Sequence, residues 1–164
     1  MRGTTRQFHS LKALLALALF CSALAGCDAA VTLENAPPRV TWVAVQPPQD
    51  GVSVLAIWLL DLEGDRVDLE MTWSGEGLDG DHAAVPASNG HGRVGLMTKQ
   101  GRQALNGQAH ELAWNVDDVP VDQQVRLSFT PTDHRGDTGE TVITPAFILQ
   151  DGLPEPVPFP VESQ

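Results

Sequence analysis

Acidic side chains are the residues of this chain whose types and spacing are best suited to chemistry. Asp61, Glu63 and Asp65 place three carboxylates within one short polar segment. Hard oxygen ligands at such spacing suit Ca²⁺. The competing interpretation is a solvated acidic turn, because Asp and Gly favour turns and the EF-hand loop pattern is absent. Calcium is therefore a candidate cofactor, and no cofactor is expected to be required.

Few other patterns in the sequence point to catalysis. The chain has no G-x-S-x-G elbow, no glycine-rich phosphate loop and no H-E-x-x-H motif around its later histidines, His82, His91, His110 and His134. A pair of glycosidase-type acids stays open, because carboxylates are plentiful and nothing selects two of them. The sequence therefore predicts a non-catalytic protein, and no catalytic residue is assigned. Arg135-Gly136-Asp137 forms an RGD tripeptide, for which chance is a better explanation than adhesion.

The first 26 residues have the pattern of an export signal. Arg2, Arg6 and Lys12 are positive, and no acidic residue occurs in this segment. Residues 13–24 are then apolar apart from one serine, a stretch too short to span a bilayer of about 30 Å as a helix. A buried N-terminal core helix is the alternative, and the flanking charges favour export.

The residues that follow this apolar stretch, Leu24-Ala25-Gly26-Cys27, resemble the lipobox of bacterial lipoproteins. The resemblance implies that a signal peptide, residues 1–26, is removed and that Cys27 carries diacylglycerol and an amide-linked acyl chain such as palmitate. Two or three acyl chains anchor a protein stably where a single chain would be reversible. We therefore expect a lipid-anchored protein of the bacterial cell envelope. Asp28 resembles an inner-membrane retention signal that does not hold in all bacteria, so the choice of membrane stays open.

Charge and cysteine usage restrict the partners further. The chain has 10 Lys and Arg against 21 Asp and Glu, a formal net charge of −11, and loss of residues 1–26 would bring it to −14. Such a surface repels nucleic acid, so the expected partners are the membrane, through the lipid, and an unidentified envelope protein or glycan. Once Cys21 is removed and Cys27 is acylated, no thiol is left for a disulfide or a thiolate metal site.

Apolar runs separated by turn residues predict strands rather than helices. Val67, Leu69, Met71 and Trp73 alternate with polar residues, so one face of that strand should be buried, together with Leu127 and Phe129. The nearly continuous apolar run 52–60 predicts a central strand buried on both sides. Further strands are expected at 39–45, 93–97, 108–114, 125–130 and 141–149.

The four tryptophans and the prolines of the chain add two expectations. Trp42, Trp58, Trp73 and Trp114 lie on predicted strands, where core packing is their default role; a sugar-stacking platform would need two of them on an exposed face. Prolines at every second position of 154–160 predict a polyproline-like tail, residues 151–164. A lipidated tether is expected at 27–38 and the folded domain at 39–150.

Six or seven short strands with no confident helix predict an all-β fold, a single antiparallel β-sandwich. The chain resembles immunoglobulin-like and fibronectin type III modules of bacterial envelope proteins through Asn35-x-Pro37-Pro38, Asp61-x-Glu63-Gly64-Asp65-x-Val67-x-Leu69 and Val125-x-Leu127 with Thr132-Asp133-x-x-Gly136. It departs from antibody domains in lacking the cysteine pair and the tyrosine corner. The resemblance implies that the turns 61–65 and 132–139 meet at one end, so that Asp133 and Asp137 join the candidate calcium ligands. It also implies that the tether and the tail leave from opposite ends.

Such modules usually bind, space or anchor. The function expected from the sequence is therefore a lipid-anchored, non-catalytic binding or structural module of the cell envelope. The alternatives are an accessory domain or enzyme acting on envelope glycans, and a surface adhesin.

Overall fold

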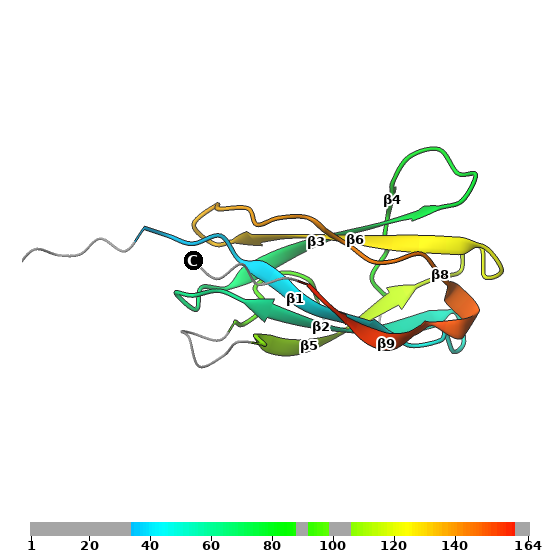
Figure 1. Cartoon of the computed structure of the whole chain (residues 1–164), viewed down its shortest axis with the longest axis horizontal. Helices are drawn as coiled ribbons and strands as arrows, with labels where there is room; N and C mark the ends of the chain where they lie inside the picture. Colours follow the sequence, from blue (N-terminus) through cyan, green and yellow to red (C-terminus); the bar gives the residue numbers. More distant parts are fainter. Residues whose placement is uncertain (1–33, 88–91, 99–105, 160–164) are drawn as a thin grey trace, which may run out of the picture. The chain divides into compact units, whose positions relative to one another are not determined.

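The computed structural model describes residues 34–87, 92–98 and 106–159. The chain divides into two compact units, Met1–Glu34 and Asn35–Gln164, and every strand described belongs to the second (Figure 1). The described strands are β1 (Arg39–Val45), β2 (Val52–Leu60), β3 (Val67–Gly75), β4 (His82–Ala83), β5 (Gln108–Asn115), β6 (Gln124–Asp133), β7 (Val142–Ile143), β8 (Phe147–Ile148) and β9 (Leu153–Pro158), with one 3₁₀ turn, η1 (Leu149–Asp151), before β9.

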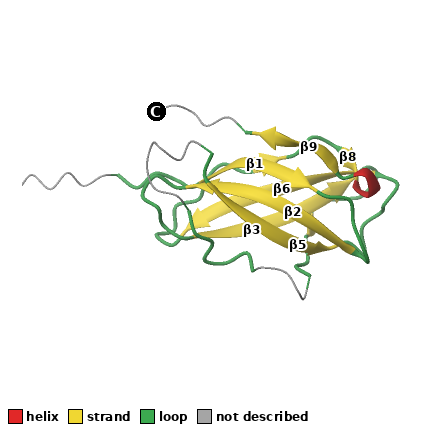
Figure 2. Cartoon of the chain, turned by 90° about the horizontal axis from the view of Figure 1, so that it is seen from below, coloured by secondary structure: helices red, strands yellow, loops and turns green. Residues whose placement is uncertain are grey.

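The strands form two antiparallel sheets packed against each other. One sheet has the order β5-β2-β1-β9, and the other has the order β4-β3-β6-β7, with β8 also paired to β6. Figure 2 shows the two layers overlaid, with β9 beside β1 at the edge of the first sheet. The predicted all-β sandwich is therefore confirmed.

A two-residue turn joins β1 and β2. Asp50 and Gly51 have φ angles of 50° and 75°, and the flanking Gln49 and Val52 exchange backbone N–H···O hydrogen bonds of 2.8 and 3.0 Å. Positive φ at both central residues is the geometry whose twist matches paired strands, and Asp-Gly favours it. Beyond the turn the pairing shifts by one residue, and in the resulting register Trp42 lies opposite Trp58.

The core lies between the sheets. Its members include the six residues predicted for it, Val67, Leu69, Met71, Trp73, Leu127 and Phe129. From the first sheet come mainly Val43, Leu55, Ile57, Leu59, Leu112 and Trp114. Along β2, however, fully buried residues alternate with partly exposed ones. The expectation that this strand is buried on both sides is wrong, because the second sheet packs against only one of its faces.

The C-terminal segment differs from the polyproline tail predicted for it. Leu153–Pro158 forms β9, which pairs antiparallel with β1 through Val43 and Val157. The Phe159 N–H also donates a 2.8 Å hydrogen bond to the Thr41 carbonyl. Neighbouring N–H groups on a strand point to opposite edges, so Pro158 and Pro156 place their missing donors on the free edge, where proline is tolerated. The chain thus returns toward the end where β1 begins, and the predicted exit at the opposite end is wrong.

Three smaller expectations are also corrected. The region 93–97 contributes one isolated bridge, Leu96 to Val67, rather than a strand. The strand expected to stop before Pro131 continues to Asp133, and 141–149 splits into β7 and β8 around Pro145. None of these changes moves a core residue to the other face.

Candidate functional site

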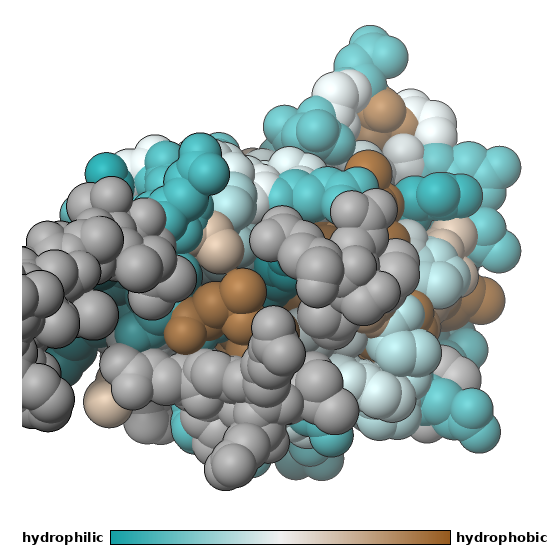
Figure 3. Space-filling view, turned by 60° about the vertical axis from the view of Figure 1, so that its left-hand side comes forward, coloured by the Kyte–Doolittle hydropathy of each residue, from teal (hydrophilic) through white to brown (hydrophobic). Residues whose placement is uncertain are grey.

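The turns that follow β2 and β6 meet at one end of the sandwich, as the resemblance implied. The His134 N–H donates a 3.0 Å hydrogen bond to the Arg66 carbonyl, which joins the two turns through their backbones. We call this region the acidic pole and define it by Asn35, Asp61, Glu63, Asp65, Asp133 and Asp137. Figure 3 looks toward this end, and the described surface visible there is teal and white around a brown apolar patch.

Asp61 acts as a buried cap of its own turn. Its side chain is 1% exposed, and Oδ1 accepts N–H hydrogen bonds from Gly64 at 2.7 Å and from Asp65 at 3.0 Å. Oδ2 is buried without a hydrogen-bond partner. Burial raises the pKa of the Asp61 carboxyl, and the two backbone hydrogen bonds only partly offset this effect. The local role of Asp61 is to shape the turn that leads into β3.

Asp133 caps the second turn in a similar way, and Asn35 adds a long-range contact. Asp133 Oδ1 accepts backbone N–H bonds from Arg135 at 2.8 Å and Asp137 at 3.0 Å. The Asn35 amide donates to Asp133 Oδ2 at 2.6 Å and to Asp137 Oδ2 at 2.7 Å. Burial acts to raise the pKa of Asp133, but these hydrogen bonds outweigh it and hold the pKa below its ordinary value.

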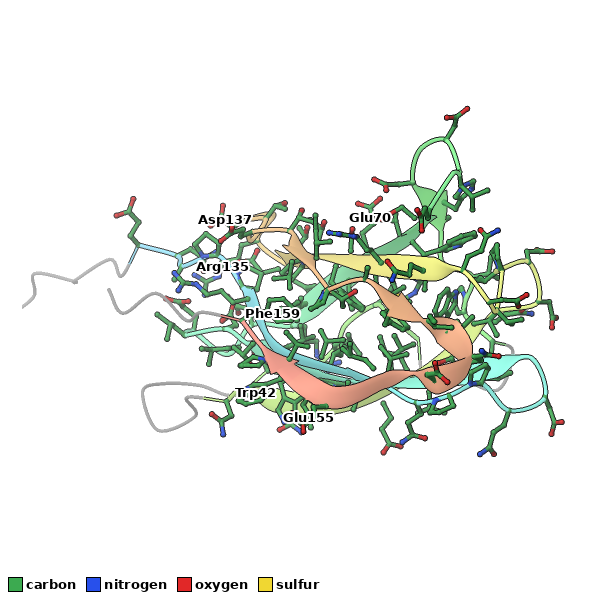
Figure 4. The ribbon with its side chains drawn as sticks, turned by 45° about the vertical axis from the view of Figure 1, so that its right-hand side comes forward. Trp42, Glu70, Arg135, Asp137, Glu155 and Phe159 are labelled. Carbon is green, nitrogen blue, oxygen red and sulfur yellow. The ribbon has the colours of Figure 1, made fainter. Side chains whose placement is uncertain are left out.

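The remaining two carboxylates of the pole also face donors. Asp65 Oδ2 lies 2.8 Å from Arg135 Nε in an ion pair, and Glu63 Oε2 accepts a 3.4 Å hydrogen bond from the Ala36 N–H. Two side chains of the RGD tripeptide, Arg135 and Asp137, are therefore engaged within the acidic pole (Figure 4). Asn35 and Arg135 were not singled out as site residues from the sequence, because their partners lie far away in the chain.

This arrangement bears on the candidate calcium ligands, Asp61, Glu63, Asp65, Asp133 and Asp137. Each of them faces an N–H donor or an arginine, and the donors reduce the mutual repulsion that a cation was expected to relieve. Within the described ranges, no three His, Cys, Asp or Glu side chains are grouped so that they could hold a metal ion. The calcium site stays a prediction, and it would require Arg135 or Asn35 to release a carboxylate.

A cavity of about 750 Å³ opens at the other end of the sandwich. Its lining includes Trp73 and His82, whose ring stacks on the indole with centroids 4.7 Å apart and an interplanar angle of 26°. Leu78, Val85 and Val119 add apolar walls, and the acidic side chains of the lining are Asp81, Asp117 and Asp118. Part of the lining comes from the segment between β3 and β5, and the dense Gly and Asp content of residues 75–81 is the signal by which the sequence could have indicated it.

Of the histidines considered from the sequence, the three that the structure describes have different partners and are not grouped. His82 stacks on Trp73, His134 Nε2 lies 3.5 Å from Asp68 Oδ1, and His110 Nε2 lies 2.6 Å from the Met97 carbonyl. His91 lies outside the described residues. The tryptophans divide into two pairs, with Trp73 and Trp114 in the core and Trp42 and Trp58 partly exposed.

The signal segment and Cys27 also lie outside the described residues, so the structure gives no geometry for the lipidation site. In the part of the chain that is described, no helix is long and apolar enough to cross a membrane. Comparisons with protein-family models, with curated proteins and with solved structures found no match to this chain. The class of protein therefore has to be argued from the chain's own residues.

Proposed function

We propose that this protein is a lipid-anchored, non-catalytic binding module of the bacterial cell envelope. The observation that carries the proposal is Leu24-Ala25-Gly26-Cys27, placed directly after a positive and then apolar N-terminal segment. The β-sandwich supports it, because such sandwiches commonly serve as rigid carriers for binding surfaces.

The strand order supports an immunoglobulin-like or fibronectin type III-like arrangement within this proposal. β1, β2 and β5 lie in one sheet and β3, β6 and β7 lie in the other. An immunoglobulin-like sandwich distributes its strands A, B and E and its strands C, F and G in the same manner. β9 would then be an additional strand beside A, and the acidic pole would consist of the B–C and F–G turns.

The contacts of Asn35 support a short connection between lipid and domain. Residues 27–38 were expected to be a tether, yet Asn35 and Ala36 already bind the acidic pole. The free connection would run only from Cys27 to Asn35, and at about 3.3–3.6 Å per residue it would span at most about 30 Å. The acidic pole would thus stay close to the bilayer surface.

The two cysteines offer a matched test of the anchor. Cells expressing the chain are labelled with radioactive palmitate, and the chain is compared with Cys27→Ser and Cys21→Ser. Cys27→Ser should lose the label and accumulate as a precursor that the lipoprotein signal peptidase does not cleave. Cys21→Ser lies in the expected signal and should be labelled and processed normally. Persistent label in Cys27→Ser would contradict the proposal.

A further inference from the structure

The two outer faces of the sandwich have opposite character. On the second sheet the outward residues of β3 and β6 are polar: Asp68, Glu70, Thr72 and Ser74 beside Arg126, Ser128, Thr130 and Thr132. On the first sheet the outward residues of β1 and β2 are Trp42, Ala44, Val52, Val54, Ala56 and Trp58. A sandwich needs apolar residues only on its inner faces, so the apolar outer face of the first sheet calls for a separate explanation.

Two tryptophans form the centre of this face. Trp42 and Trp58 are direct cross-strand partners on β1 and β2. Their row continues to Pro158 on β9 and to Ala109 on β5, so it crosses all four strands. In the next row Ala44 lies opposite Ala56, and both of these side chains are small. We call the surface made by Trp42, Trp58, Pro158, Ala109, Ala44 and Ala56 the tryptophan face.

A carboxylate flanks the tryptophan face on its β5 side. Glu111 lies opposite Ala56 on β5 and is exposed. Together with the net charge of −11, this acid disfavours an anionic partner such as nucleic acid, an acidic polymer or an anionic bilayer.

A neutral sugar polymer matches this combination of groups. In a β-linked polymer of glucose-type rings the hydroxyls are equatorial, so each ring exposes two C–H faces and a hydroxyl rim. The C–H faces can stack on indole rings, whose π faces are electron-rich. The rim hydroxyls can donate hydrogen bonds to carboxylates, and bonds to a charged acceptor are the stronger kind.

We propose that the tryptophan face binds a neutral, β-linked polysaccharide, with pyranose rings stacked on Trp42 and Trp58 and hydroxyls bonded to Glu111. The proposal rests on the binding function proposed above and names the chemistry of its partner. A second copy of this chain is the less favourable occupant, because two surfaces of the same strong negative charge would have to approach each other.

The test uses the full chain purified in detergent, with insoluble cellulose and chitin as probes. The chain should be retained on at least one polymer, and soluble hydroxyethyl cellulose should compete better than anionic carboxymethyl cellulose. Trp42→Ala and Trp58→Ala should each weaken retention about tenfold, the scale expected for an anchoring aromatic residue. Trp42→Phe and Trp58→Phe keep a ring and should retain most of the binding.

Two further variants keep the test decisive. Ile143→Ala removes an exposed apolar side chain, 53% accessible, from the second sheet and should bind like the unchanged chain. Ala44→Glu leaves both tryptophans in place but adds a charged side chain beside them, so it should abolish retention without loss of thermal stability. Failure of the unchanged chain to bind either polymer, or equal binding by Trp58→Ala, would overturn the proposal.

Self-association is the remaining outcome, and it also decides the question. If the unchanged chain is not retained but elutes as a dimer that Ala44→Glu converts to a monomer, the tryptophan face is an interface between copies and the proposal is wrong. Acylation of Cys27 is measured without any polysaccharide. The failure of this inference and the failure of the lipid anchor can therefore be told apart.

Discussion

The side-chain amide of Asn35 donates a 2.6 Å hydrogen bond to Asp133, 98 residues further along the chain. The same amide reaches Asp137 at 2.7 Å. A residue of the segment before β1 therefore closes the turn after β6 and ties the entrance of the domain to the acidic pole.

This contact predicts a stability effect for Asn35→Ala. The variant leaves Asp133 Oδ2 buried without its donor, and hydrogen bonds to charged groups contribute about 1.5–3 kcal/mol. The free energy of unfolding in urea should fall by about that amount. Asn115→Ala, which removes an amide on β5, is the comparison outside the pole. A loss below about 0.5 kcal/mol in Asn35→Ala would mean that the contact contributes little.

Asp61→Asn and Asp133→Asn should change stability in opposite directions at pH 7. Burial raises the pKa of Asp61, so its charge opposes folding above the folded-state pKa. The amide keeps the Oδ1 acceptor and removes that charge, so the melting temperature should rise. The hydrogen bonds around Asp133 outweigh burial and lower its pKa, so its charge favours folding, and Asp133→Asn should lower the melting temperature.

The pH dependence gives the control for this pair. The Asp133 contribution is complete above the ordinary value of 3.8 and is lost as the pH falls through the lower folded-state pKa, so the deficit of Asp133→Asn should shrink below pH 3.8. The advantage of Asp61→Asn should be complete above the raised folded-state pKa and should shrink as the pH falls from that pKa to 3.8, a range that lies above the one for Asp133. If the two variants shift the melting temperature in the same direction at pH 7, the conclusion that the Asp61 charge opposes folding and the Asp133 charge favours it would be contradicted.

Trp73→Ala should be strongly destabilising. The indole is 7% exposed, and replacing a large core side chain by alanine typically costs about 3–5 kcal/mol. Ile143→Ala, at an exposed position of the same sheet, should stay within about 0.5 kcal/mol of the unchanged chain. Denaturant unfolding measures both, and a change below about 1 kcal/mol for Trp73→Ala would place that side chain outside the core.

Truncation distinguishes strand β9 from a tail. A chain ending at Gly152 loses β9, which leaves the β1 edge unpaired, so it should melt at a lower temperature and aggregate on storage. A chain ending at Phe159 keeps β9 and its contact with Thr41 and should behave like the full chain. Light scattering and thermal unfolding measure the two effects, and equal behaviour of both truncations would show that β9 does not protect the edge.

Calcium titration tests the acidic pole. If Asp61 and Asp65 take part in a site, Ca²⁺ must compete with the ion pair between Asp65 and Arg135. Millimolar Ca²⁺ should then raise the melting temperature of Arg135→Ala more than that of the unchanged chain, and the effect should vanish in Asp61→Asn/Asp65→Asn. Stabilisation at a hundred times the dissociation constant is about 2.7 kcal/mol. A melting curve of Arg135→Ala that does not respond would exclude the site.

The sequence alone was sufficient for the strands that alternate strictly and for their inward faces. Val67, Leu69, Met71 and Trp73 are separated by polar residues, so period two determines which side is buried. The meeting of the turns 61–65 and 132–139 followed from a resemblance in their residues. Both depend on local pattern, which a single sequence records directly.

Tertiary structure decided what the local pattern leaves ambiguous. In the run 52–60 apolar residues occupy both faces, so periodicity cannot show that Leu55 lies inside and Trp58 outside. In 153–158 the alternating prolines fit a polyproline segment as well as an edge strand, and only pairing with β1 selects the strand. The donors that satisfy Asp133 and Asp65 come partly from Asn35 and Arg135, whose distance along the chain hides them until the fold brings them together.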